Sequence, residues 1–177
     1  MSIPEEFHAI SAEEALRRVQ TEGWCVIDGV IPQNSVTEVK DSLIAVLAGR
    51  SSVSGVITED QSFVPFLLDE RLSAISEGLL GDGYRIARTD VISAGSDYIG
   101  TGWHADWPFS GEGSYQVAAP YGDLSMALST TWMLTDSSVA TEGTLIVSGS
   151  HRTDGNPAGS GDAEGDGYGV GDRVASQ

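Results

Sequence analysis

Apolar residues recur with helical spacing at the start of the chain. Ser11 and Glu14 have the spacing of a capping box, apolar positions follow every three to four residues, and Gly23 interrupts the pattern. These features predict an amphipathic helix over residues 12–22. The apolar positions are Ala15, Leu16 and Val19.

Two further stretches repeat this spacing. Pro32 precedes the second stretch, which ends before Gly49, and the third ends at Gly81. Proline is favoured at the start of a helix and glycine just after its end, so these residues mark the predicted boundaries. The apolar positions are Val36, Val39, Leu43 and Leu47 in the second stretch and Phe66, Leu67, Leu72, Ile75 and Leu79 in the third.

A different pattern occupies residues 24–31, WCVIDGVI, and much of the chain after residue 83. Here short runs of β-branched, aromatic and other apolar residues are separated by Gly, Pro, Asp and Ser. Such runs predict strands joined by turns. The first is expected to be a buried strand that stops near Asp28 and Gly29. The later predicted strands fall within 84–95, 97–107, 123–136 and 143–150.

Helices followed by a series of strands predict an α+β fold that is mainly β. In such a fold the N-terminal helices pack outside an antiparallel barrel or jelly roll. The 177 residues are enough for one domain with a hydrophobic core. Within this single domain we expect a mostly helical part over 1–83, jelly-roll strands over 84–154 and a loop rich in glycine and aspartate over 155–172.

The amino-acid composition indicates in which compartment the protein is found and which classes of partner it does not bind. The 26 acidic and 9 basic residues give a formal net charge of -17, and a surface field of this sign repels nucleic-acid phosphates. The sequence shows neither the run of about 20 apolar residues that a membrane span needs nor a signal peptide. The lone Cys25 predicts an unreactive, buried thiol in a reducing compartment. We therefore expect a soluble cytoplasmic protein.

The stretch GTGWHADWPF, residues 100–109, carries the candidate chemistry. His104 and Asp106 are two positions apart, so their side chains lie on the same face of an extended chain. An imidazole and a carboxylate, completed by one further histidine, form the ligand set of non-haem Fe(II) oxygenases. Such a set leaves positions on the metal for a 2-oxo acid and O2. The alternative interpretation is a hydrogen-bonding surface pair without metal.

Three segments read GWCVIDGVIPQNSVTEVKDSL, WHADWPF and STTWMLTDSSVATEGTLIVSGSHR. In this order they resemble the phytanoyl-CoA dioxygenase family of Fe(II)- and 2-oxoglutarate-dependent oxygenases, and the similarity covers roughly residues 12–152. The resemblance implies a double-stranded β-helix, a jelly roll related to the cupins. It also implies that His104 and Asp106 ligate iron and that Trp132 lies beside the 2-oxoglutarate pocket. The implied reaction uses O2 to hydroxylate a small organic substrate.

The chain departs from the family pattern after its Gly-Ser-His loop. The family places a distal iron-binding histidine and a 2-oxoglutarate-binding arginine on later strands, but no histidine follows His151, and Arg173 falls in or after the glycine-rich loop. One interpretation is that the chain is truncated before the final barrel strands, and this is the interpretation we favour. The other is that His151 is itself the third ligand.

The same residues leave two functions open. The carboxylate of Asp106 favours hydroxylation over halogenation, because related halogenases replace it with a small residue so that chloride binds the iron. A non-catalytic, cupin-like binding module or inactive relative is the alternative, since the distal ligand is missing. Arg85 and Arg88 are expected to form salt bridges with acidic groups rather than to bind an anionic substrate.

Overall fold

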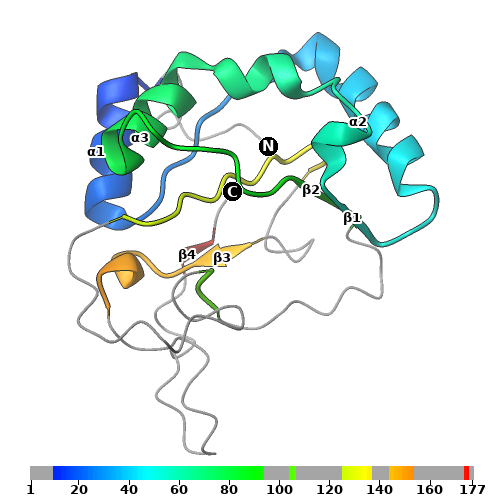
Figure 1. The fold of residues 1–177 in the computed structure, drawn as a ribbon. Helices are drawn as coiled ribbons and strands as arrows, with labels where there is room; N and C mark the ends of the chain where they lie inside the picture. Colours follow the sequence, from blue (N-terminus) through cyan, green and yellow to red (C-terminus); the bar gives the residue numbers. More distant parts are fainter. Residues whose placement is uncertain (1–9, 94–103, 107–124, 137–143, 154–173, 176–177) are drawn as a thin grey trace, which may run out of the picture.

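A computed structural model of the chain describes residues 10–93, 104–106, 125–136, 144–153 and 174–175. Within these ranges the protein combines helices with small antiparallel sheets (Figure 1). The loop expected over 155–172 and Arg173 lie outside the described residues. The helices are α1 (Ala12–Glu22), α2 (Gln33–Leu47) and α3 (Glu70–Leu80), the 3-10 turns are η2 (Val56–Thr58), η3 (Val64–Leu68) and η6 (Ser150–Arg152), and the strands are β1 (Ser52–Ser54), β2 (Asp90–Ile92), β3 (Leu145–Ile146) and β4 (Val174–Ala175).

The first two predicted helices are confirmed, together with their end signals. The Ser11 hydroxyl accepts a hydrogen bond of 3.2 Å from the amide of Glu14, and Gly23 ends α1 in the left-handed region at φ 86°. Helix α2 begins directly after Pro32. Glycine and proline therefore mark these boundaries as the sequence predicted.

The third predicted helix is interrupted. The chain forms the 3-10 turn η3 and then restarts as α3 after Asp69, whose φ and ψ of -53° and 131° are not helical. The Asp69 carboxylate accepts a hydrogen bond of 2.9 Å from the amide of Arg71, so it caps the new helix. An N-cap residue in the middle of the apolar pattern explains why one predicted helix is two elements.

Two apolar clusters hold the helices together. Ala15 and Val19 of α1 pack with Ile75 of α3, and Gly78 permits close contact, since a Cβ there would lie 2.5 Å from a methyl of Leu16. The second cluster surrounds α2 and includes Val39 and Leu43 with Val56 and Phe63. Burial of such side chains contributes roughly 1.5–3 kcal/mol each before entropy is counted.

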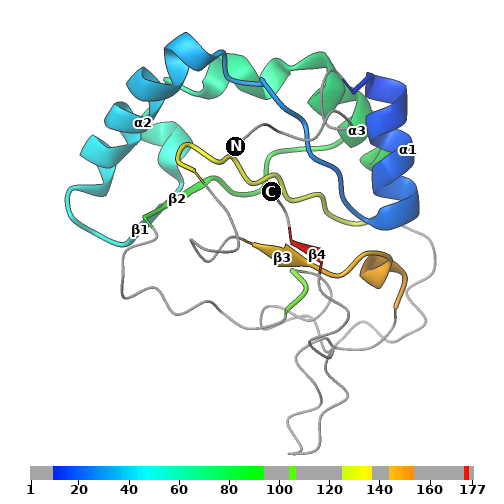
Figure 2. The ribbon, with the colours of Figure 1, turned by 180° about the vertical axis from the view of Figure 1, so that it is seen from behind.

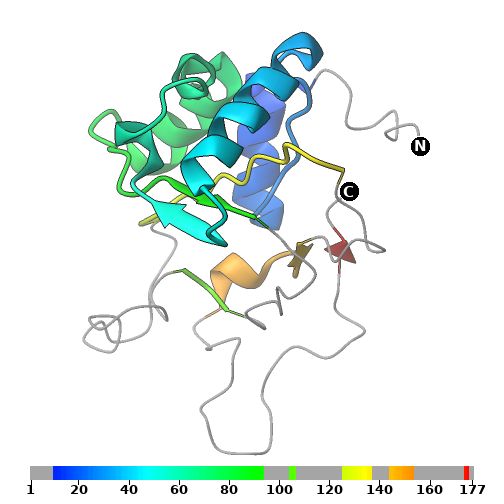
Figure 3. The same ribbon diagram turned by 90° about the vertical axis from the view of Figure 1, so that its right-hand side faces the viewer.

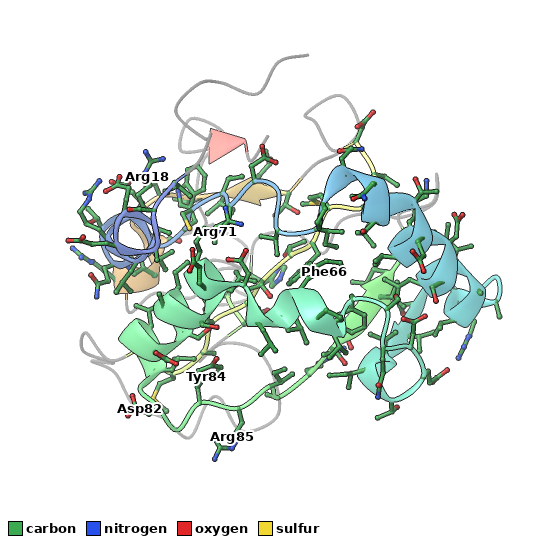
Figure 4. The ribbon with its side chains drawn as sticks, turned by 90° about the horizontal axis from the view of Figure 1, so that it is seen from above. Arg18, Phe66, Arg71, Asp82, Tyr84 and Arg85 are labelled. Atoms are coloured by element: carbon green, nitrogen blue, oxygen red, sulfur yellow. The ribbon has the colours of Figure 1, made fainter. Side chains whose placement is uncertain are left out.

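Arg71 links α3 to the segment that follows α1. Its guanidinium forms a 2.7 Å ion pair with Asp69 and donates to the carbonyl of Asp28 at 3.0 Å (Figure 4). Less than a fifth of each charged side chain is exposed, 18% of Arg71 and 16% of Asp69. The Arg71 guanidinium chiefly holds the pKa of Asp69 below its ordinary value, so the pair stays ionised at neutral pH.

The strands form two short antiparallel ladders. β1 pairs with β2, with Val53 opposite Val91, and β3 pairs with β4, with Ile146 opposite Val174. Both pairs are antiparallel, and two separate short pairs neither show nor exclude a jelly roll. Much of the predicted strand region lies outside the described residues, so the jelly roll stays a prediction.

Two predicted strands are wrong for a physical reason. Among the described residues, 24–27 and 125–136 belong to no ladder, and residues 28–31 form a turn followed by bends. The apolar side chains of both runs pack on the helices instead. Cys25 and Leu128 contact the cluster of α1 and α3, whereas Leu134 contacts the cluster around α2. Figures 1 and 2 show residues 125–136, in yellow, passing between the helices and the ladder of β3 and β4.

Helix length also bears on the membrane prediction. In the part of the chain that the structure describes, no helix has both the length and the apolar character required to cross a bilayer.

Candidate metal site

His104 and Asp106 face each other at the surface of the protein. The Nε2 atom of His104 lies 3.9 Å from Oδ1 of Asp106, and 55% and 62% of the two side chains are exposed. Ala105 between them is half-buried, as expected when alternate residues of an extended chain point to opposite sides. Their segment belongs to neither ladder, so the strand predicted over 97–107 is absent from its described part.

The separation of these two groups is compatible with one shared ion. Ligands at right angles on a metal, with bonds of about 2.1 Å as in zinc sites, lie about 3 Å apart. A small side-chain rotation brings Nε2 and Oδ1 from 3.9 Å into this range. Imidazole nitrogen and carboxylate oxygen are both suitable donors for a non-haem ferrous ion. The pair therefore fits two positions of such a site.

Ser129 contacts this pair from a distant part of the sequence. Its hydroxyl donates a hydrogen bond of 2.5 Å to Oδ2 of Asp106. Residues 125–136 thereby lie beside residues 104–106, and Figure 3 shows the latter as a short green segment on the side of the molecule away from the helices. No local sequence pattern predicted this contact, because Ser129 is 23 positions from Asp106.

Arg88 adds positive charge near the acidic group. Its guanidinium forms a 2.5 Å ion pair with Asp90 and donates to the hydroxyl of Ser54 at 3.3 Å. Asp90 chiefly, and Asp106 to a smaller extent, raise the pKa of Arg88. The predicted salt bridge is confirmed for Arg88, whereas Arg85 donates to the carbonyls of Gly83 and Tyr84 and points outward (Figure 4).

Trp132 shares a segment with Ser129 but not its orientation. The indole N–H donates to the hydroxyl of Thr130 at 3.1 Å. Leu128, Trp132 and Leu134 are half-buried, whereas Ser129 is exposed. Residues an odd number of positions apart in an extended chain point to opposite sides. Trp132 is thus less exposed than Ser129, and its contact with 2-oxoglutarate stays a prediction.

His151 lies against the end of α1 and not beside His104. Its Nε2 is 3.3 Å from the carbonyl of Gln20, and its ring occupies the space over Gly23, where a Cβ would lie 2.4 Å from Nδ1. Within the described residues, no group of three His, Cys, Asp or Glu side chains is placed to hold a metal ion. The structure therefore does not bring His151 to the pair as a third ligand.

The loop containing His151 caps α1. The amide of Gly149 donates to the carbonyl of Glu22 at 2.7 Å, and Arg152 donates to the carbonyl of Gln20 at 2.6 Å. The last carbonyls of a helix have no partner within the helix, and basic groups there interact favourably with its dipole. The sequence SGSHR thus has a structural role in this protein.

Comparisons of the chain with protein-family models, with curated proteins and with solved structures found no match.

Proposed function

We propose that the chain binds a ferrous ion through His104 and Asp106 and uses it, with 2-oxoglutarate and O2, to hydroxylate a small organic substrate. The observation that carries the proposal is the convergence of Nε2 and Oδ1 at 3.9 Å on an exposed edge of the molecule. Imidazole and carboxylate in this relation supply two ligands of the facial set used by such enzymes. The resemblance to the phytanoyl-CoA dioxygenase family suggests the co-substrate.

Each residue has a definite task in this proposal. His104 presents the lone pair of Nε2, which requires its ring proton to be on Nδ1. Asp106 offsets part of the positive charge of the ion through its carboxylate. When bound, the ion supplies positions for a 2-oxo acid and for O2, and the oxidising chemistry that hydroxylation needs. Exposure of both side chains gives these small molecules access from solvent.

A second candidate is a metal-binding module without catalytic activity. It is favoured by the position of His151, which is engaged with the end of α1, and by the absence of a three-ligand group among the residues described. Two protein ligands bind a divalent ion more weakly than three. In this alternative the metal is held by the same pair, but 2-oxoglutarate is not consumed.

Anaerobic titration of the whole chain with Fe(II) and 2-oxoglutarate tests the proposal. Chelation of the ion by the 2-oxo acid produces a weak absorption band in the visible, and His104→Ala should abolish it. His151→Ala is the matched control because it removes a different histidine, and it should retain the band. Admission of O2 in the presence of substrate should then yield succinate.

The two candidates differ in the last step. A band without succinate formation would favour the binding module. A band that survives His104→Ala but disappears in His151→Ala would contradict the assignment of the site.

A further inference from the structure

The hydroxyl of Ser129 holds one oxygen of the Asp106 carboxylate, while the other oxygen faces His104. The bond from Ser129 Oγ to Oδ2 is 2.5 Å long, and Oδ1 lies 3.9 Å from Nε2 of His104. We infer that Ser129 is a positioning residue, which orients Asp106 so that Oδ1 is presented to the metal. This inference rests on the proposed function and extends it to the residue that prepares the ligand.

The geometry of a carboxylate makes this coupling direct. Its two oxygens are fixed relative to each other, so a hydrogen bond to Oδ2 sets the rotation of the whole group and the direction of Oδ1. Hydrogen bonds from a hydroxyl to an ionised carboxylate are short, typically about 2.5–2.7 Å, and stronger than bonds between neutral groups. The 2.5 Å bond from Ser129 falls in this class.

Packing alone does not orient these ligands. More than half of each side chain is exposed, at 55% for His104 and 62% for Asp106. An exposed side chain samples several rotamers, and ordering it on metal binding costs conformational entropy. A hydrogen bond that restricts Asp106 beforehand reduces this cost. Partners of this kind typically change metal affinity by about 10- to 100-fold.

The position of Ser129 is set by the helical part of the molecule. Leu128 precedes it and packs against the cluster of α1 and α3, and Leu134 packs against the cluster around α2. These contacts fix residues 125–136 along the helices, and the alternation of the chain turns Ser129 toward Asp106. The helical core thus supports a ligand of the proposed site.

The test compares two variants of nearly equal shape. Ser129→Thr keeps the hydroxyl and Ser129→Val removes it, so the pair isolates the hydrogen bond from the bulk of the side chain. Mn(II), a probe for the ferrous ion, is titrated into the whole chain, and free Mn(II) is measured by its electron paramagnetic resonance signal. We expect Ser129→Val to bind about 10- to 100-fold more weakly than wild type, and Ser129→Thr to bind nearly as well.

Ser129→Ala provides the second variant, because it removes the hydroxyl without adding a methyl group. It should reproduce the weak binding of Ser129→Val, while the urea midpoints of all three variants stay near that of wild type. Unchanged affinity in Ser129→Val and Ser129→Ala would overturn the inference and leave the site of His104 and Asp106 intact. If Ser129→Thr and Ser129→Val lost Mn(II) affinity equally and Ser129→Ala lost none, the added methyl group would be the cause. This outcome would overturn the inference too. Failure of wild type to bind Mn(II) would overturn both proposals.

Discussion

Residues 10–93 and the described segments after them differ in how deeply their side chains are buried. All buried side chains of the described chain lie in the first region, between Ile10 and Ile75. In the later segments, the described side chains are half-buried or exposed, and His104 and Asp106 are more than half exposed. The first region therefore supplies the hydrophobic core, and the later one carries the polar groups of the candidate site.

The difference shows how a core can support chemistry that lies outside it. Residues 125–136 contact both apolar clusters through Leu128 and Leu134, and they reach Asp106 through Ser129. Residues 148–152 reach the end of α1 through Gly149 and His151. Both segments are positioned by the helices. A substitution that disrupts the helical core is therefore expected to disturb the candidate site as well, whereas a substitution in the site is expected to leave the core intact.

The largest expected effect comes from opening the core. Ile75 is 3% exposed and belongs to the cluster of α1 and α3. Ile75→Ala should lower the free energy of unfolding by about 2–5 kcal/mol, because it removes buried methyl groups and leaves a cavity. Urea unfolding followed by far-ultraviolet circular dichroism measures this change.

Met126→Ala is the matched control in the later region. Met126 is 54% exposed, and surface substitutions usually change stability by less than about 0.5 kcal/mol. Equal losses in both variants would contradict the view that stability is concentrated in the helices.

A smaller loss of stability is expected when the contact between the two regions at Gly23 is disrupted. Gly23 and Gly49 both have left-handed backbones, at φ 86° and 83°, but a Cβ meets His151 only at position 23. Gly49→Ala should cost about 1–2 kcal/mol for the backbone alone. Gly23→Ala should cost about 1 kcal/mol more, since displacing the ring removes its hydrogen bond to Gln20.

A double-mutant cycle with His151→Ala completes this measurement. If the ring of His151 is already displaced in Gly23→Ala, adding His151→Ala should lower stability little further. Additive losses would show that the loop and α1 are not in contact in solution.

The sequence predicted the first region better than the second because helix signals are local. The Ser11 cap, Pro32 and Gly23 act within a few residues of their own positions, so α1 and the start of α2 were predicted correctly. The division at Asp69 was missed, since an apolar spacing continued across it. A strand forms only beside a partner strand, which can be distant in the sequence. The apolar side chains of the runs at 24–31 and 125–136 pack against helices instead.

The candidate site was predictable only in part, because only its local contacts can be read from the sequence. His104 and Asp106 are close in sequence, and their convergence follows from the alternation of an extended chain. Ser129 is 23 positions from Asp106, and no local pattern links the two. His151 shared the SGSHR motif of the resemblance, but its packing over Gly23 depends on the tertiary fold.

The smallest expected effect lies wholly in the first region, at Glu14. Its carboxylate accepts hydrogen bonds from Arg17 at 2.7 Å and from Arg18 at 2.9 Å, and these lower its pKa from 4.5 to about 2. A carboxyl group with a lowered folded pKa stabilises the protein above its unfolded value and loses this contribution as the pH falls toward the folded value. The thermal midpoints of wild type and Glu14→Gln should therefore differ most above pH 4.5 and converge toward pH 2.

Glu13→Gln is the control, since it removes a negative charge from the same exposed turn of α1. Because the pairs of Glu14 are on the surface, the difference should be small and should shrink at high salt. A difference that stays constant from pH 7 to pH 2 would show that the ion pairs do not form. Affinity for Mn(II) at pH 7 should not change in Glu14→Gln, because the described route from α1 to Asp106 runs through the packing of Leu128, which does not involve the charge of Glu14.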